Sequence, residues 1–433
     1  MAFIEVLVLV LTFIILLGVG LPIAFSIAIS ATVTLLLSVP AMAALTTIAQ
    51  RMATGLDSFT LLAIPFFILA GQLMNSGGIA RRLIDFARAL VGALPGGLAF
   101  VNIVANMLFG AISGSAVASA SAIGGAMGPR MEKEGYDKAF SAAINISSAT
   151  TGLIIPPSNT LIVFSLASGG VSIAALFMAG YLPGLLIGGL LMLTAGIMAK
   201  RRNYPRGEKA SFAEVARTLV SATPSLLMLV VVIGGIVNGL FTATEASAIA
   251  VLYSACLAAV YREVSQKHIR PLLLDTIKTT SIVLFLVATS IALSWVMAYE
   301  NIPQSITTAL LNISDNPILI LLIINVILLA VGVFMDITPA ILIFTPIFLP
   351  VVVATGMDPV HFGVMMILNL CIGLCTPPVG SVLFVGCSVA KIKIQNVIKP
   401  LLPLFITMLV GLMLVTFLPE ISLTLPRALG LID

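Results

Sequence analysis

Ten stretches of at least 20 residues contain no Asp, Glu, Lys or Arg, and this feature limits the possible folds more than any other. A helix needs about 20 apolar residues to cross a bilayer. Of the 433 residues, 60% are apolar and 9% are charged, against roughly 25% charged in soluble domains. A core surrounded by water cannot bury so much apolar surface. The sequence therefore predicts an all-α polytopic membrane protein embedded in a lipid bilayer, and it excludes a cytosolic enzyme and a nucleic-acid binder. The uncharged stretches are 6–50, 58–80, 89–129, 139–199, 218–244, 279–299, 316–335, 337–357, 359–390 and 400–419.

An internal repeat relates the two halves of the chain. A shift of 221 residues superimposes several landmark residues, and it aligns a Pro-Pro pair that interrupts an apolar stretch in each half. Landmarks at one fixed offset are typical of a repeated architecture. The matched positions are Pro129 and Pro350, Gly135 and Gly356, Asp137 and Asp358, and Pro156-Pro157 and Pro377-Pro378.

The charges at matched positions predict that the two repeats have opposite orientations in the membrane. Residues 130–138 carry three basic side chains, whereas the matched residues 351–359 carry none. Conversely, residues 391–399 carry three lysines and the matched residues 170–178 are uncharged. Because basic loops lie on the cytoplasmic side, each loop should face the side opposite to its mate. This inverted-topology arrangement is common in secondary transporters.

The resulting map has about ten crossings, two re-entrant hairpins and two broken helices, as in an elevator-type ion transporter. Both termini are expected in the periplasm. The map divides the chain into scaffold units and transport units joined by a basic linker. These units are 1–97, scaffold helices and a cytoplasmic arm; 98–198, hairpin 1 and its broken helix; 199–218, the cytoplasmic linker; 219–315, scaffold helices and a periplasmic arm; and 316–433, hairpin 2 and its broken helix.

Polar turns at the hairpin tips and Pro-Pro breaks in the following helices are the candidate functional segments. Irregular backbone at membrane depth is tolerated where it is buried in protein or lines a watery cavity. A Pro-Pro pair removes two N–H donors and interrupts the helix. The carbonyls before the break can then face a cation, and the N-terminus of the new half-helix can face an anion.

We therefore predict two Na⁺ sites, each formed by a hairpin tip and a broken helix, beside a carboxylate substrate. The first Na⁺ site combines Ser113, Gly114, Ser115, Ile155 and Pro156. The second combines Met335, Asp336, Thr338, Thr376 and Pro377. The expected substrate-binding residues are Ser115, Ser158, Asn159, Thr338, Thr376 and Gly380.

Structural roles compete with these assignments. Proline breaks can be simple kinks, and Ser and Thr hydroxyls often join membrane helices. Asp336 can bind a cation, or it can cap the helix that returns from the hairpin tip. Thr242 and Glu245 have the spacing of a capping box, and a structural role is expected there. Cys371 and Cys375 share a helix face, where small apolar packing is the expected role and a metal or redox pair is the alternative.

Several motifs resemble the large membrane subunit of TRAP (tripartite ATP-independent periplasmic) transporters, the DctM type. The resemblance covers essentially the whole chain. Its strongest matches lie at the first hairpin tip, at the first helix break and around the proposed capping box. These motifs are Ser113-Gly114-Ser115-Ala116, Gly135-Tyr136, Ile154-Ile155-Pro156-Pro157-Ser158, Leu176-Phe177-Met178-Ala179-Gly180, Pro183-Gly184 and Phe241-Thr242-Ala243-Thr244-Glu245-Ala246.

The resemblance implies a function and two protein partners. The function is uptake of an organic acid, such as a C4-dicarboxylate or a sugar acid, across the bacterial inner membrane. A Na⁺ gradient would drive it, with an elevator-like movement, no other cofactor and no enzymatic reaction. The implied partners are a small four-helix membrane subunit and a periplasmic solute-binding receptor.

Two other functions remain open on the residues alone. A stand-alone Na⁺-coupled carboxylate carrier of the same broad fold would need no receptor. A membrane-embedded redox or enzyme subunit would need His, Cys or Asp ligands paired on facing helices, and the sequence shows no such arrangement.

Overall fold

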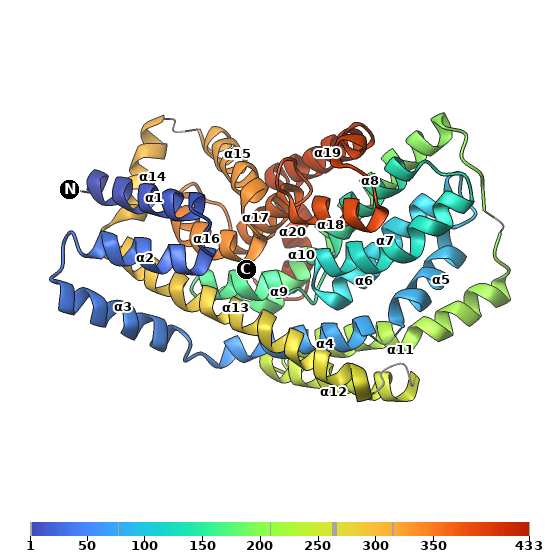
Figure 1. Cartoon of the computed structure of the whole chain (residues 1–433), viewed down its shortest axis with the longest axis horizontal. Helices are drawn as coiled ribbons and strands as arrows, with labels where there is room; N and C mark the ends of the chain where they lie inside the picture. The colour runs from blue at the N-terminus through green and yellow to red at the C-terminus, as the bar shows by residue number, and fades with distance from the viewer. Residues whose placement is uncertain (1, 77, 208, 262–265, 314–315, 433) are drawn as a thin grey trace.

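The computed structural model of the chain describes residues 2–76, 78–207, 209–261, 266–313 and 316–432. These ranges form helices and short connections, without a strand (Figure 1). Within them, seven helices are long and apolar enough to cross a membrane, and a bent helix pair raises this number to eight. The prediction of an all-α polytopic membrane protein is confirmed. The count of ten crossings includes shorter and broken helices and stays a prediction.

The arm, the hairpin and the broken helix of the first repeat follow one another in the predicted order. A hairpin of two helices is followed by a helix that is interrupted at the first Pro-Pro pair. The elements are α1 (Ala2–Gly18), α2 (Ile23–Leu35), α3 (Ala41–Gly55), η1 (Phe59–Leu62), α4 (Ala63–Ser76), the arm α5 (Ile79–Val91), the hairpin α6 (Gly97–Ser113) and α7 (Ala116–Lys133), the broken helix α8 (Lys138–Ala149), η2 (Thr151–Leu153) and α9 (Asn159–Ala167), and α10 (Ile173–Arg201).

The second repeat has the same order of hairpin and broken helix. Its elements are α11 (Phe212–Val237), α12 (Ala243–Tyr261), α13 (Gln266–Tyr299), the arm α14 (Ile302–Ile313), the hairpin α15 (Pro317–Phe334) and α16 (Ile337–Ala354), the broken helix α17 (Pro359–Gly373) and α18 (Ser381–Ala390), α19 (Ile394–Phe417) and α20 (Glu420–Ala428).

The landmarks that revealed the repeat have the same local role in both halves. Gly135 and Gly356 have φ values of 84° and 87°, a backbone conformation that favours glycine. Two residues later, Asp137 and Asp358 cap α8 and α17, and their carboxylates accept hydrogen bonds from N–H groups of the first turn. Both Pro-Pro peptide bonds are cis. The repeat is therefore one of backbone geometry as well as of sequence.

Two helices were missing from the sequence map. The map assigned no helix to residues 40–57, which form α3, or to the residues after 418, which form α20. Helix α3 is short and contains Gln50 and Arg51, so it lacks the hydropathy of a full span, while its alanines favour helix. It joins η1 and α4 at a bend of 62°. The guanidinium carbon of Arg51 in α3 lies 4.9 Å from the ring centre of Trp295 in α13.

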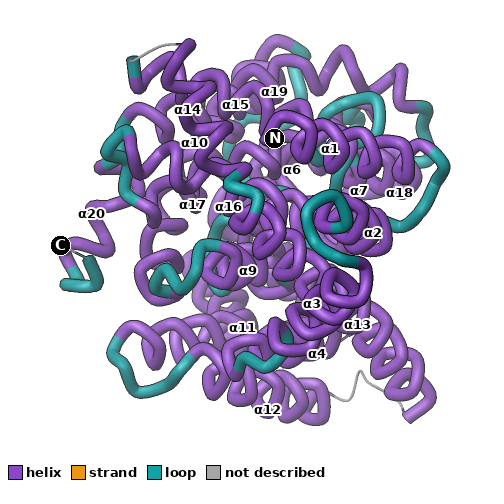
Figure 2. Tube along the Cα trace, turned by 90° about the vertical axis from the view of Figure 1, so that its left-hand side faces the viewer, coloured by secondary structure: helices purple, strands orange, loops and turns teal. Residues whose placement is uncertain are grey.

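The hairpin units of the two repeats pack into one body, and the remaining helices flank it. Helix α18 packs against α7 and α8, α19 against α8 and α10, and α16 against α9. On the other side, α12 packs along α4, and the long α13 crosses α2, α3 and α4 (Figures 1 and 2). Helix α13 also touches α16 of the second hairpin. The tips of both hairpins therefore lie between this body and the flanking helices.

Candidate functional site

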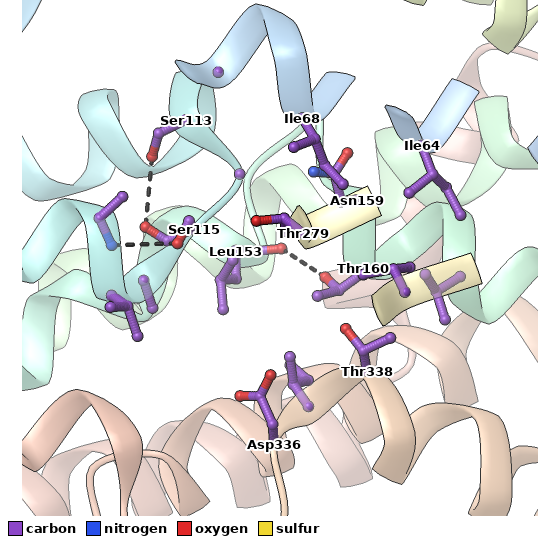
Figure 3. Close-up of a pocket in the computed structure, with 18 of the residues that line it drawn as sticks. Ile64, Ile68, Ser113, Ser115, Leu153, Asn159, Thr160, Thr279, Asp336 and Thr338 are labelled. Atoms are coloured by element: carbon purple, nitrogen blue, oxygen red, sulfur yellow. Dashed lines mark hydrogen bonds between the residues drawn. The ribbon is translucent and has the colours of Figure 1, made fainter. Parts of the chain in front are cut away.

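One cavity of ≈ 300 Å³ is lined by the tips of both hairpins (Figure 3). Ser113, Gly114 and Ser115 come from the first tip, and Asp336 and Thr338 from the second. In Figure 3, Asp336 and Thr338 lie across an open space from Ser115, Leu153 and Thr160. Because the two tips are matched segments of the repeat, the cavity lies where the two repeats meet.

The first tip is formed by a helix end and a new helix start in immediate succession. Gly114 ends α6 in the left-handed conformation, with φ 62°, and its N–H donates to the Gly110 carbonyl at 2.8 Å. Ser115 then caps α7, because its Oγ accepts a hydrogen bond from the Ala118 N–H at 3.2 Å. A Cβ on Gly114 would lie 3.0 Å from Nδ2 of Asn159. The tip therefore touches the start of the half-helix that follows the first break.

Asp336 occupies the N-cap position of α16, but its side chain makes no capping hydrogen bond. The usual donors are the backbone N–H groups of the second and third helical residues. The third residue here is Pro339, which has no N–H. The Asp336 carboxyl lines the cavity, and it interacts with the backbone N–H of Ile337, the first residue of α16. The choice between the two roles that the sequence left open stays a prediction.

The first helix break places hydroxyl groups around a freed carbonyl. The Leu153 carbonyl accepts hydrogen bonds from Ser158 Oγ and from Thr160 Oγ1, the latter at 3.2 Å. The two hydroxyl oxygens lie 2.7 Å apart. The hydroxyl protons are thus used within the break, and of the two hydroxyls Thr160 lines the cavity, where its oxygen keeps lone pairs for a cation. Asn159 and Thr160, which begin α9, line the cavity.

The structure places some of the predicted site residues in the lining of the cavity and the others outside it. The residues that line the cavity are Ser113, Gly114, Ser115, Asn159, Asp336 and Thr338. Those that do not line it are Ile155, Pro156, Ser158, Met335, Thr376, Pro377 and Gly380.

The two helix breaks are not equivalent in this structure. Residues 154–158 of the first break are buried, whereas Val379 in the second break is 46% exposed. The hydroxyl of Thr376 donates to the Ile372 carbonyl of its own helix at 2.8 Å. Leu374, just before the second break, does reach the cavity. The shared cavity therefore contains both tips but only the first break.

Two elements outside the prediction, and one further residue of the first broken helix, also contribute polar side chains to the cavity. Gln72 and Asn75 come from α4, Thr279 from α13, and Thr160 from α9. Gln72 and Asn75 are three residues apart near the end of an apolar helix, which places them on one helix face. This polar pair on one face of an apolar helix is the sequence signal that could have predicted a contribution of α4 to the site. It was missed because the prediction considered only tips and breaks.

A single ionisable side chain lies in the described lining of the cavity. It is Asp336, and the other polar side chains there carry hydroxyl or amide groups. A carboxylate substrate placed there gains no lysine or arginine partner from the described lining. Because like charges in a poorly hydrated site repel strongly, a bound organic anion would need cations beside it.

Buried asparagines hold each hairpin to the broken helix behind it. Asn106 of α6 donates to Asn145 Oδ1 of α8 at 3.1 Å, and Ser119 of α7 donates to Asn106 Oδ1 at 2.7 Å. In the second repeat, Asn369 of α17 donates to Asn325 Oδ1 of α15 at 2.7 Å. Satisfied polar networks in a buried setting fix a unique packing. They therefore position the tips relative to the breaks.

The expected capping box is also present. Thr242 N–H and Thr242 Oγ1 both donate to Oε2 of Glu245, each at 2.8 Å, and Glu245 N–H lies 3.3 Å from Thr242 Oγ1. These reciprocal bonds satisfy the first turn of α12. The structural role predicted for Glu245 is confirmed.

Comparison with known proteins gives consistent matches over nearly the whole chain. A family model described as "Tripartite ATP-independent periplasmic transporter, DctM component" matches residues 10–421. The chain is 58% identical over 392 residues to the uncharacterized protein YgiK of Salmonella typhimurium, which covers 90% of each chain. It is 41% identical to the 2,3-diketo-L-gulonate TRAP transporter large permease protein YiaN of Escherichia coli, over 86% of this chain and 88% of that one. It is 38% identical to the C4-dicarboxylate TRAP transporter large permease protein DctM of Rhodobacter capsulatus, over 89% and 91%.

A solved structure has a similar fold. The crystal structure of the Alcanivorax borkumensis YdaH transporter matches with a TM-score of 0.64, over 88% of this chain and 89% of that chain, at 15% identity. At that identity the likeness concerns the fold alone.

Proposed function

The chain belongs to the DctM family of TRAP transporters, as a large membrane permease subunit, and from this premise we propose that it takes up an organic acid with Na⁺. Na⁺ would bind with the substrate at the hairpin tips, and the Na⁺ gradient would drive entry. The organic acid would be delivered by a periplasmic receptor.

The observation that carries this proposal is the composition of the cavity between the tips. It holds Asp336, several hydroxyl and amide groups, and no lysine or arginine among its described lining residues. Oxygen-rich surroundings suit Na⁺, and half-helix N-termini suit a carboxylate. A cation bound beside Asp336 would offset the charge of the incoming acid. Coupling would follow, because neither ion binds well without the other.

The substrate class is suggested by the relatives and fits the cavity. One relative is named for 2,3-diketo-L-gulonate and another for C4-dicarboxylates, and all of these are small organic acids. We propose a C4-dicarboxylate or a sugar acid for this chain as well. A cavity of ≈ 300 Å³ is at the lower end of the usual range for small-molecule sites, in keeping with acids of that size.

The partners follow from the family. We propose that the chain acts with a small four-helix membrane subunit and a periplasmic solute-binding receptor in the bacterial inner membrane. A stand-alone carrier is the alternative outcome of the test below.

Reconstitution tests the proposal. Proteoliposomes should contain the permease, with or without the small subunit, and receptor loaded with a radiolabelled organic acid should be added outside. We expect uptake only with all three proteins and an inward Na⁺ gradient, and a K⁺ gradient of the same size should give none. Equal uptake without receptor would establish the stand-alone carrier. Uptake indifferent to Na⁺ would refute Na⁺ coupling.

A further inference from the structure

A second polar cavity, of ≈ 230 Å³, lies between α7, α8 and α18, and its lining shares no residue with the cavity at the hairpin tips. It is bordered by the basic segments 130–138 and 391–399, which the charge pattern predicts to be cytoplasmic. The cavity is thus expected to open to the cytoplasm at the base of the first hairpin.

Three glycines of α7 create the space. Gly124 is required by packing, because a Cβ there would lie 2.3 Å from Nδ2 of Asn145. Gly125 and Gly128 are different, since a Cβ at either position would meet no atom within 4 Å. Glycine inside a helix costs about 1 kcal/mol relative to alanine. The packing of the chain gives no reason for these two glycines, and both border the cavity.

The charged groups around the cavity favour an anion. Lys138, at the start of α8, and Lys391, at the end of α18, both line it, and Glu132 is the carboxylate in the described lining. Lys138 Nζ lies 3.6 Å from Glu132 Oε1 in a half-exposed pair. The second lysine leaves the lining with an excess positive charge. A small anion entering the cavity would meet that charge.

A buried amide among the lining residues supplies a second indication. Asn102 is 1% exposed and lines the cavity. Its Oδ1 accepts from Asn106 at 2.7 Å, whereas its Nδ2 has Met131 Sδ as acceptor at 4.0 Å. Thioether sulfur is a weak acceptor. A ligand oxygen in the cavity would give this buried donor a proper partner.

We propose that this cavity binds a small carboxylate anion at the cytoplasmic face. Lys391 adds the excess positive charge beside the Lys138–Glu132 pair, Asn102 offers a buried amide N–H, and the bare backbone at Gly125 and Gly128 lets the anion approach α7. The identification of this anion with the transported organic acid, after its release, rests on the proposed function. The existence of the site does not.

The test measures the charge preference of a thiol placed inside the cavity. The permease carries Gly125→Cys in a background with the exposed Cys256 changed to Ser, and it is held in lipid nanodiscs. Reaction rates are measured with an anionic sulfonatoethyl and a cationic trimethylammonioethyl methanethiosulfonate. The matched reference is Glu134→Cys, which is exposed on the same basic segment and does not line the cavity.

We expect the ratio of anionic to cationic rates to be higher at the Gly125→Cys thiol than at the reference by roughly 25-fold, because one unit charge near contact in water speeds the anion and slows the cation by about fivefold each. Lys391→Gln should remove most of that excess. Succinate should slow the reaction at the cavity thiol and leave the reference unchanged, and Gly128→Leu should abolish this protection by filling the space. The control Gly189→Leu, at an exposed position of α10 where a Cβ also meets nothing within 4 Å, should leave the rates and the protection by succinate unchanged.

Equal rate ratios at the two thiols, or the absence of protection by succinate, would overturn the proposal. Protection by inorganic phosphate without protection by succinate would show that the ligand is not a carboxylate. Failure of Na⁺-driven uptake in the reconstituted system would leave these thiol rates unaffected, so a failure of the proposed function and a failure of this site are distinguishable.

Discussion

A Cβ on Gly71 would lie 2.7 Å from the carbonyl oxygen of Ser113. Helix α4 therefore touches the first hairpin tip at a position where no side chain fits. A movement of the tip during transport would break this close contact between α4 and Ser113. The tip can take its place beside the cavity only because residue 71 has no side chain.

Gly71→Ala should impair uptake while leaving membrane expression intact. The added methyl group forces the tip or α4 to shift, and overpacking of this kind costs roughly 1–3 kcal/mol, or about fivefold or more in rate or affinity. The assay is initial uptake in the complete reconstituted system. The control is Gly234→Ala in α11, where a Cβ meets nothing within 4 Å. Normal uptake by the Gly71→Ala protein would show that the contact is unimportant.

Asn106→Ala should lower the thermal stability of the purified protein. Asn106 is fully buried, and its removal takes away the donor of Asn145 Oδ1, the nearer donor of Asn102 Oδ1 and the nearer acceptor of Ser119 Oγ. Each unsatisfied buried group costs about 1–3 kcal/mol. Asn238→Ala, which removes an exposed bond to the Gly234 carbonyl, should have little effect. Equal melting temperatures for the two variants would contradict the structural role of the network.

Much of this fold could be predicted from the sequence because the constraint is physical. Uncharged stretches must lie in lipid, and Pro-Pro pairs must break helices. The left-handed turns at Gly135 and Gly356 need glycine, so the repeat remained visible. Helix α3 was missed because Gln50 and Arg51 give it the composition of a surface segment, and its place on α13 is decided by tertiary packing.

Only part of the cavity lining could be predicted, because local sequence patterns mark some of its residues and tertiary packing alone places the others. The tips and breaks have local signatures, namely polar turns and prolines in apolar surroundings. Gln72 and Thr279 have no such signature, because their place in the cavity depends on how α4 and α13 pack against the hairpins. The sequence repeat alone suggested two equivalent half-sites. The exposure of Val379, which makes the second break differ from the first, depends on packing that the sequence does not reveal.

The orientation of the repeats is tested by labelling from each side of the membrane. A cysteine at Ala89 on the arm α5 should react with an impermeant maleimide only from the cytoplasm. A cysteine at Asn312 on the arm α14, where the residue is exposed, should react only from the periplasm. Spheroplasts and inverted vesicles provide the two faces, with Cys256 replaced by Ser in both variants. Labelling of both arms from one face would contradict the inverted topology.

Asp336→Asn should weaken Na⁺ binding without loosening α16. The carboxylate makes no capping hydrogen bond to the second or third helical residue, and the side-chain oxygen of Asn can still accept from the Ile337 N–H, so the change mainly removes charge from the cavity. Asn also caps helices as well as Asp does. The measurement pairs Na⁺-dependent uptake with the melting temperature in detergent. A fall in melting temperature with unchanged Na⁺ dependence would assign Asp336 a structural role.

The most direct test of the account is the Na⁺-activation curve of uptake in the complete reconstituted system. Ser115 and Thr338 lie at opposite tips of one cavity, and each offers a hydroxyl oxygen. Loss of one such ligand should cost roughly 1.5–3 kcal/mol, as for a hydrogen bond to a charged group, which is about tenfold to over a hundredfold in affinity. Ser115→Ala and Thr338→Val should each move the half-saturating Na⁺ concentration upward by at least that lower factor. The exposed control Thr223→Val, whose hydroxyl bonds its own helix, should leave the curve in place. If both tip variants keep the parent curve, Na⁺ does not bind at the hairpin tips and the central claim is wrong.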